Sequence, residues 1–236
     1  MSNIDFGFFS SLKGEFEAEG LSRINIAAEA LFAARHGLDY LVKIGGCEAK
    51  ADLYYLADLG VSSIVAPMIE TPFAMQKYME MLLDGHFQHV GVTIETTTAV
   101  ENIEGILDSG VKLTEVTIGR TDLTASYQGT SVDSADTMEM VKKVAKAAKA
   151  RGLKVTMGGS VNKKTREFLL QQQEFRNLLD CVETRKAAMP VDKFLDDRAL
   201  GEALKLEALL LDMRAQGPER VLPALHARKS AITSRV

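Results

Sequence analysis

The sequence has few of the residues on which several classes of protein depend. Its 236 residues include two cysteines, Cys47 and Cys181, which form neither a disulfide framework nor a CxxC pair. No apolar run approaches the ~20 residues that a membrane-spanning helix needs. The apolar N-terminal residues are not preceded by the basic segment of a secretory signal peptide. We therefore expect a cytoplasmic protein with no membrane partner.

An excess of positive charge is also missing. The formal net charge is −4 and the pI is near 5.7, so the basic surface typical of nucleic-acid binders is not expected. The hydrophobic fraction of 46% and the charged fraction of 25% are ordinary for a globular protein. At this length a single α/β domain can bury a sizeable core. These values predict an intracellular enzyme with no nucleic-acid partner, and they indicate nothing about its reaction.

Short apolar runs alternate with segments of helical period along most of the chain. This alternation predicts a parallel sheet with crossover helices, either a (β/α)8 TIM barrel or an open doubly wound sheet. Seven strands leave a barrel one strand short, so we expect the eighth from Phe6–Ser10, or an irregular closure at the N-terminus. The expected strands are Lys13–Phe16, Tyr40–Ile44, Ser63–Met68, Val90–Ile94, Leu113–Ile118, Leu153–Met157 and Leu179–Met189.

The chain divides into two expected parts. Residues 1–190 form the barrel domain, and residues 191–236 form a helical extension rich in Ala and Leu, with no further strand. Helix limits are well marked in places: Thr71-Pro72 is typical of an N-cap followed by the first helical residue, and Ser134–Arg151 has the pattern of a long amphipathic helix. We expect the extension to pack on the barrel or on a neighbouring subunit.

Barrels and open α/β sheets both place their chemistry at the carboxyl ends of the strands. Carboxylates dominate these positions, and no histidine follows a predicted strand. The histidines are expected at helix ends or in the tail, so a histidine zinc site and a Ser-His-Asp triad lack their parts. A nucleotide-binding GxGxxG or P-loop motif is also missing. The four histidines are His36, His86, His89 and His226.

Two acids, Glu95 and Asp122, end successive predicted strands in VTIETTT and VTIGRTDL. Adjacent parallel strands lie ~4.8 Å apart, so both carboxylates can converge on one cation. Mg²⁺ is usually held by one or two carboxylates, with substrate oxygens and water completing the octahedron. The alternative is that both are ordinary acids, with Asp122 capping a helix or turn and Glu95 paired with a lysine.

Lys43 ends a third predicted strand, just before Gly45 and Gly46. Three roles are open for it: binding of a substrate carboxylate, a surface pair with Glu17, or a Schiff base with a carbonyl substrate. The two glycines either let backbone N–H groups approach a carboxylate or form a tight turn.

Further candidates for substrate binding follow other strands. Arg120 either touches substrate or neutralises the acids beside it, and Arg185 is expected to share a strand face with Glu183 as an ion pair. Pro67 and Thr93 complete the set.

The segment VTIETTTAVENIEGIL followed by VTIGRTDLTASYQG resembles the signature pair of the HpcH/HpaI aldolase and citrate lyase β-subunit family. VKIGGCEAKADLYYLADLGVSSIVAPMIETPFAMQKY is similar to the region before it, so the resemblance runs roughly from Lys13 to Met189. It implies a phosphoenolpyruvate/pyruvate-type (β/α)8 barrel with Mg²⁺ (or Mn²⁺) at the positions of Glu95 and Asp122. It further implies a carbon–carbon lyase or aldolase acting on a small 2-oxo acid or a related carboxylate or acyl substrate, and a homo-oligomer built through the terminal helices.

The sequence departs from this family at candidate site residues and in a Gly-rich segment, which is shortened here to DGHFQHVGV. Lys43 stands where relatives carry an arginine, which supplies charge without the bidentate fork. Phe16 stands where aldolase members carry an acid/base histidine, which leaves Glu15 or Glu17 as the candidate base, and only one of these faces the interior. Two alternatives to the metal-dependent lyase therefore remain: a Schiff-base aldolase through Lys43, and an inactive barrel that binds a ligand or partner.

Overall fold

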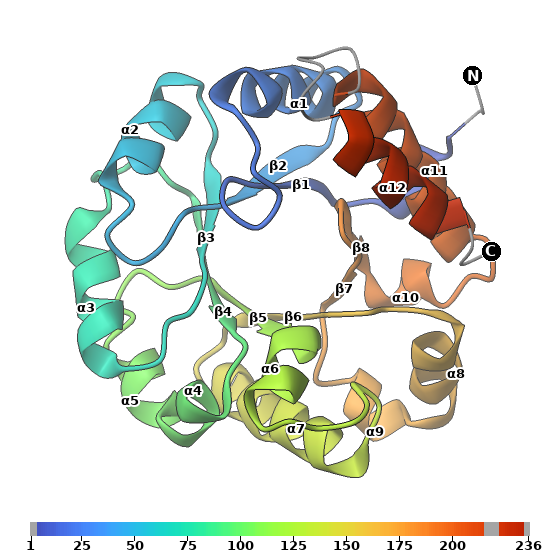
Figure 1. The fold of residues 1–236 in the computed structure, drawn as a ribbon. Helices are drawn as coiled ribbons and strands as arrows, with labels where there is room; N and C mark the ends of the chain where they lie inside the picture. Colours follow the sequence, from blue (N-terminus) through green and yellow to red (C-terminus); the bar gives the residue numbers. More distant parts are fainter. Residues whose placement is uncertain (1–3, 215–221, 234–236) are drawn as a thin grey trace.

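The computed structural model describes residues 4–214 and 222–233 of the chain. Eight strands form a closed barrel in sequence order, which confirms the predicted fold class (Figure 1). Neighbouring strands from β1 to β7 are parallel, as crossover helices require. The strands are β1 Ser11–Glu15, β2 Asp39–Lys43, β3 Ser63–Ala66, β4 His89–Ile94, β5 Glu115–Gly119, β6 Lys154–Gly158, β7 Cys181–Glu183 and β8 Ala187–Pro190.

Helices surround the barrel, and α3 and α7 begin where the sequence marks their first residues. The Thr71 hydroxyl accepts from the Ala74 N–H, with Pro72 as the first helical residue, and Ser134 caps α7 in the same way. The helices are α1 Arg23–Arg35, α2 Lys50–Asp58, α3 Pro72–Met81, α4 Thr97–Glu101, α5 Ile103–Asp108, α6 Arg120–Ser126, α7 Ala135–Ala150, α8 Lys163–Gln171, α9 Gln173–Arg176, α10 Val191–Phe194, α11 Ala199–Arg214 and α12 Leu222–Thr233.

The barrel closes differently from the prediction. The segment Leu179–Met189 is two antiparallel strands, β7 and β8, and β8 also pairs antiparallel with β1. Three residues separate β7 from β8, too few for a crossover helix, so the chain can only turn back. The prediction that Phe6–Ser10 supplies the eighth strand is wrong: Phe6–Phe8 forms a short 3-10 helix, η1, capped by the Asp5 carboxylate.

Polar side chains fill the interior of the barrel, while apolar ones face the helices. Along β5, the apolar Val116 and Ile118 face outward and are fully buried, and the residues between them face the axis. Glycines on neighbouring strands make room for long acids: a Cβ on Gly119 would lie 3.0 Å from the Cβ of Glu95. The buried inward-facing polar residues include Lys13, Glu15, Thr93, Glu95, Glu115, Thr117, Thr156 and Glu183.

The C-terminal helices follow directly from β8, which ends at Pro190. α11 lies against the barrel and α12 against α11 (Figure 1). Arg214 at the end of α11 donates to the carboxylates of Glu19 and Glu29, and Lys186 in the β7–β8 turn donates to the same two acids. Within the described parts of the chain, no helix combines the length and apolar character that crossing a bilayer requires.

Candidate active site

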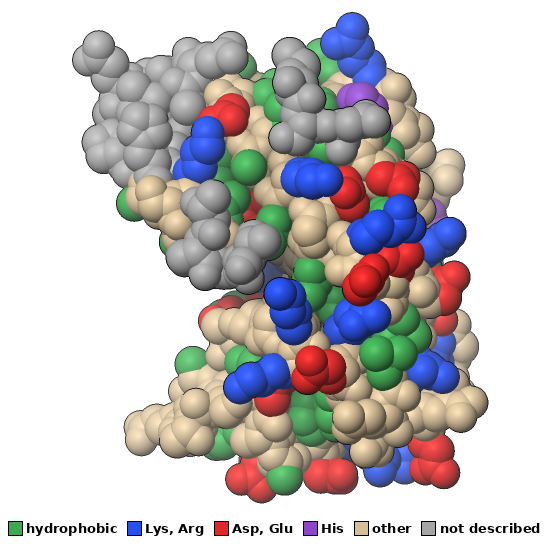
Figure 2. Space-filling model, turned by 90° about the vertical axis from the view of Figure 1, so that its right-hand side faces the viewer, with side chains coloured by type: hydrophobic (Ala, Val, Ile, Leu, Met, Phe, Trp, Pro, Cys, Tyr) green, Lys and Arg blue, Asp and Glu red, His purple; other side chains and the backbone are tan. Residues whose placement is uncertain are grey.

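The carboxyl ends of the parallel strands meet at the face turned toward the viewer in Figure 1, where α6 lies at the rim beside the end of β5. Figure 2 shows the molecule from the right-hand side of Figure 1, so this face forms its left-hand edge, and that edge is hollowed. Lys43 and Glu95 both end strands at this face, and Glu15 ends β1 beside Lys43. The mouth is therefore where Lys43, Glu95 and Glu15 come together.

Glu95 is the most constrained acid of the mouth, with only 2% of its surface exposed. One carboxylate oxygen accepts the Met68 N–H at 3.1 Å, and the other lies 3.5 Å from the Lys43 ammonium. Burial raises the pKa of the Glu95 carboxyl and the Asp122 charge raises it further, against the lowering effects of Lys43 and the Met68 N–H. Glu95 is thus a buried carboxylate whose negative charge is incompletely balanced.

The backbone around Glu95 is shaped to hold it. Met68 adopts φ +54°, a left-handed conformation that is strained for a side chain of this kind, and its N–H meets the carboxylate in that conformation. On the other side, a Cβ on Gly119 would lie 3.1 Å from Oε2 of Glu95, the oxygen that lies near Lys43. Both neighbouring strand ends are therefore fitted to this one side chain.

Asp122 lies in the first turn of α6, which begins directly at the end of β5, and its side chain is exposed. The carboxylate is close enough to Glu95 for its charge to raise the pKa of that group. An acid in the first turn of a helix is also favoured by the helix dipole, so the alternative of a simple helix-end acid shares this geometry. Two acids from neighbouring strand ends thus lie near one another, as the spacing predicts.

A chain of buried charges continues from this pair across the barrel. The Lys13 ammonium lies 2.7 Å from Glu15 and 2.5 Å from Glu183. Burial alone would raise the pKa of Glu15, but Lys13, Lys43 and Arg185 overcome this effect and hold it below the usual value of 4.5. Glu15 is therefore an ionised carboxylate beside Lys43.

The two candidate bases of the first predicted strand differ because β1 ends at Glu15. Glu15 is buried in the interior, whereas Glu17 lies past the strand end and is exposed. Phe16, between them, packs edge-on against Tyr55 with ring centroids 6.4 Å apart. Of the histidines, His89 begins β4 at its amino end, contrary to the expectation of a helix end, and the side chain of His226 lies outside the described part of the chain.

The charges of the mouth suit a divalent cation. Four carboxylates, those of Glu15, Glu95, Glu183 and Asp122, face two ammonium groups, those of Lys13 and Lys43. This leaves a formal excess of two negative charges, presented by the oxygen ligands that Mg²⁺ and Mn²⁺ prefer. Among the described residues, no group of three or more His, Cys, Asp or Glu could hold a metal. An ion at Glu95 and Asp122 would take its other ligands from substrate and water.

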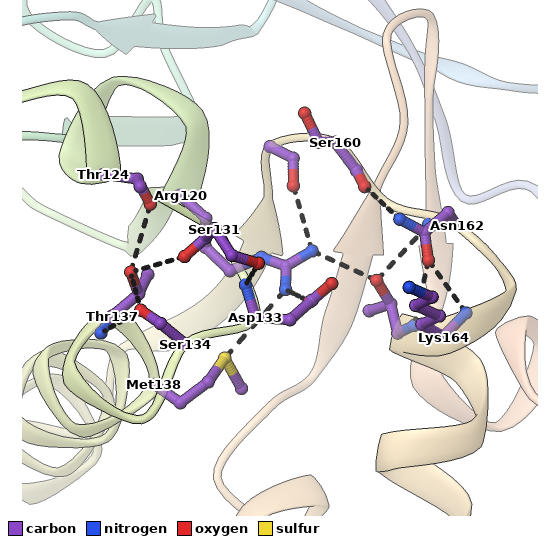
Figure 3. A network of polar contacts seen from close by, with 12 residues as sticks. Arg120, Thr124, Ser131, Asp133, Ser134, Thr137, Met138, Ser160, Asn162 and Lys164 are labelled. Carbon is purple, nitrogen blue, oxygen red and sulfur yellow. Dashed lines mark hydrogen bonds and ion pairs between the residues drawn. The ribbon is translucent and has the colours of Figure 1, made fainter. Parts of the chain in front are cut away.

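In the described part of the chain Arg120 pairs with Asp133 and with none of these acids, and its side chain lies in the polar network of Figure 3. Its guanidinium is fully buried and donates to the carbonyls of Gly158 and Gly159, to Asp133 and to Thr165, with Met138 Sδ at 4.0 Å. A guanidinium has five N–H donors, and five acceptors surround this one. A contact between Arg120 and substrate would require this arrangement to break.

The other predicted substrate contacts are distributed around the mouth. Thr93 is buried one layer below Glu95, and Pro67 precedes Met68 in the loop after β3. The Gly45 N–H is used internally, since it donates to Asp52, and Gly46 follows in a turn. The expected pair between Arg185 and Glu183 is wrong: Arg185 pairs with Glu19, because the turn after β7 directs it outward, and Glu183 pairs with Lys13.

Comparison with known proteins gives this site its context. The sequence profile of the HpcH/HpaI aldolase/citrate lyase family matches residues 23–179, about two thirds of the chain. The chain belongs to this family. The region matched contains Lys43, Glu95 and Asp122, and the family consists of lyase-type enzymes. No match is found among curated proteins.

Solved structures share the fold at low sequence identity. An HpcH/HpaI aldolase/citrate lyase family protein from Burkholderia cenocepacia is 18% identical, with a TM-score of 0.63 over 84% of this chain and 85% of that one. Citrate synthase SbnG is 13% identical, with a TM-score of 0.59 over 69% and 73%. Malate synthase from Haloferax volcanii, solved as a lead(II) complex, is 12% identical, with a TM-score of 0.56 over 93% and 84%. At these identities the likeness supports the barrel fold.

Proposed function

We propose that the protein is a metal-dependent carbon–carbon lyase or aldolase acting on a small 2-oxo acid or a related carboxylate or acyl substrate. The observation that carries the proposal is the pair of acids at the mouth, Glu95 and Asp122, beside the ammonium of Lys43. Enzymes of the family generally depend on a divalent metal. Mg²⁺ or Mn²⁺, held by these two carboxylates, would act as a Lewis acid toward negative charge developing on the substrate's carbonyl oxygen.

The chain's own residues would prepare the substrate for this chemistry. Lys43 offers a cation to the substrate carboxylate or to the developing oxyanion, and Glu15 on one side and Glu95 on the other keep its ammonium in place. The Met68 N–H holds one oxygen of Glu95 and the Lys43 ammonium lies 3.5 Å from the other, so this second oxygen and Asp122 would meet the ion beside that ammonium. These side chains are preorganised, since neighbouring ion pairs and backbone contacts hold them before substrate arrives.

Proton transfer is the step for which the chain departs most from an aldolase with a histidine base. Phe16 cannot exchange a proton, and Glu17 is exposed at the rim. Glu15 is buried and ionised, but it can accept a proton only by weakening its ion pair with Lys13. We propose that Glu15 serves mainly to orient the Lys43 ammonium.

A test combines metal dependence with covalent trapping. Cleavage of 4-hydroxy-2-oxo acids, followed by coupled detection of pyruvate, should require added Mg²⁺ or Mn²⁺ and stop with EDTA. Activity should be lost in Glu95→Gln and Asp122→Asn. EDTA-resistant activity with borohydride trapping of pyruvate on Lys43 would instead establish the Schiff-base aldolase. Binding of 2-oxo acids without turnover under all conditions would establish an inactive barrel.

We also propose that the chain forms a homo-oligomer. Ile24 and Leu31, two turns apart on the same face of α1, are 81% and 69% exposed, and such apolar side chains favour a covered surface. Light scattering at micromolar concentration should give a mass that is a multiple of 25.8 kDa. A strict monomer would contradict this proposal.

A further inference from the structure

A buried arginine next to the proposed metal ligands has a role that the proposed function leaves open. Arg120 is 0% exposed, yet it lies two residues before Asp122 and directly after Gly119, the glycine fitted to Glu95. Burying a guanidinium is costly unless its donors are satisfied. Burial lowers the pKa of this group, and the Asp133 carboxylate opposes that effect.

The acceptors around Arg120 come from three different segments. The carbonyls of Gly158 and Gly159, at 3.1 and 2.9 Å, belong to the end of β6 and the turn after it. Asp133, at 2.8 Å, belongs to the loop before α7. Thr165, at 3.2 Å, lies in the first turn of α8. One side chain thus ties the start of α6 to each segment that borders it (Figure 3).

Backbone packing at the same place leaves α6 little freedom. Gly159 has φ +84°, and a Cβ there would lie 2.5 Å from the Thr121 amide nitrogen and 2.7 Å from that of Arg120. The Thr121 hydroxyl also lies 3.1 Å from that of Ser160. The turn after β6 therefore packs directly against the first turn of α6. The Arg120 guanidinium joins the two turns through its hydrogen bonds to the carbonyls of Gly158 and Gly159.

Asp122 gains its position from this arrangement. Its carboxylate has no hydrogen-bond or ion-pair partner in the described part of the chain, so nothing but the helix that carries it sets its place above the mouth. By contrast, Glu95 is held directly by Met68 and Lys43. Whatever fixes the first turn of α6 therefore fixes where the backbone of Asp122 lies relative to Glu95.

We propose that Arg120 is a positioning residue, which clamps α6 so that Asp122 is held beside Glu95 at the mouth of the barrel. This inference rests on the proposed function for its consequence, a preformed metal site, but the clamp itself concerns the metal-free protein. Lysine in place of Arg120 keeps the positive charge but loses the planar guanidinium. Its ammonium can therefore donate to only some of the five acceptors around Arg120.

The test uses the intact chain and two independent readouts. Asp133→Asn removes the partly exposed carboxylate that pairs with Arg120. Arg120→Lys replaces the planar guanidinium with an ammonium, which keeps the charge and offers fewer N–H donors. Glu104→Gln is the matched control, because it removes a carboxylate paired with an arginine, Arg151, at a 2.7 Å contact on α5. Hydrogen exchange over residues 120–126 is measured without metal, and Mn²⁺ affinity is measured by calorimetry.

The expected result is faster exchange over residues 120–126 in both clamp variants and in neither the wild type nor Glu104→Gln. The dissociation constant for Mn²⁺ should rise about tenfold in Arg120→Lys, the lower end of the range for residues that support metal ligands. Unchanged exchange in the clamp variants would overturn the inference, and so would faster exchange with unchanged Mn²⁺ affinity. Faster exchange in both clamp variants, together with a wild type that binds no Mn²⁺, would support the clamp and refute the proposed function.

Discussion

Replacing Glu95 with glutamine should change the stability of the protein in opposite directions without and with metal. Without metal the variant should be at least as stable as the wild type, and with metal it should be less stable. Without metal, the Glu95 carboxylate is buried near Asp122, and its folded-state pKa lies above the usual 4.5. The folded protein then binds more protons than the unfolded chain, so wild-type stability falls as pH rises through this range. Glutamine removes the charge, keeps the shape and still accepts from the Met68 N–H. Metal-free Glu95→Gln should therefore unfold at a temperature at or above that of the wild type at pH 7.

Metal should restore the advantage of the wild type. An ion that binds only the folded state adds about 2.7 kcal/mol at a free concentration 100 times its dissociation constant. For a chain of this size each kcal/mol shifts the melting temperature by about 2–4 °C. Mg²⁺ should thus raise the wild-type melting temperature by roughly 5–11 °C. Glu95→Gln should gain nothing.

Scanning calorimetry with EDTA and with Mg²⁺ measures both effects. Glu115→Gln is the matched control. Glu115 is also buried in the barrel, and this burial is the main reason that the pKa of its carboxyl is raised. However, Glu115 begins β5 and so lies at the opposite end of the barrel from the mouth. It should keep the full metal-induced shift. The reasoning is refuted if Glu95→Gln retains that shift or if Glu115→Gln loses it. A metal-free Glu95→Gln that is several kcal/mol less stable than the wild type would make the Glu95–Lys43 contact a structural ion pair.

Three further predictions follow from single features. The Thr117 hydroxyl is buried with no hydrogen-bond partner among the described residues, so Thr117→Val should raise the free energy of unfolding by about 1 kcal/mol in urea titrations; a loss of stability would show that the hydroxyl is bound. Burial would raise the pKa of Glu19, but Lys186, Arg214 and Arg185 hold it below 4.5, so its contribution is present above that pH and lost as pH falls through the folded value. Glu19→Gln should therefore cost about 3 kcal/mol at pH 7, with the difference shrinking in acid, and a pH-independent difference would contradict this. Gly119→Ala places a Cβ 3.0 Å from that of Glu95, so Mn²⁺ should bind about tenfold more weakly, whereas unchanged affinity would show that Glu95 can shift freely.

Local signals in the sequence were sufficient for most of the fold. Capping residues such as Thr71 and Ser134 predict helix starts because their hydroxyls satisfy free amide groups. The β7–β8 hairpin could not be found in this way, because its turn, Thr184-Arg185-Lys186, contains none of the Gly, Pro or Asn that mark tight turns. Helix α6 was missed because seven residues with two β-branched threonines carry almost no helical pattern.

The candidate site shows what spacing can and cannot predict. Glu95 and Asp122 lie near one another because strand ends share an edge, which the sequence pattern contains. Alternation along SLKGE places Lys13 on the same face as Glu15, a signal that could have revealed the interior ion pairs with Glu183. From its place beside Asp122, Arg120 was expected either to touch substrate or to neutralise the acids next to it. Its five acceptors lie on segments up to 45 residues away, so only the tertiary structure shows where its side chain goes.

A crystal structure of the protein with Mn²⁺ and oxalate, using anomalous scattering to locate the ion, tests the central claim most directly. Mn²⁺ is predicted within about 2.2 Å of carboxylate oxygens from both Glu95 and Asp122, with oxalate oxygens completing its coordination and facing Lys43. An ion bound elsewhere, or bound while Asp122 points away from Glu95, would contradict the proposed site.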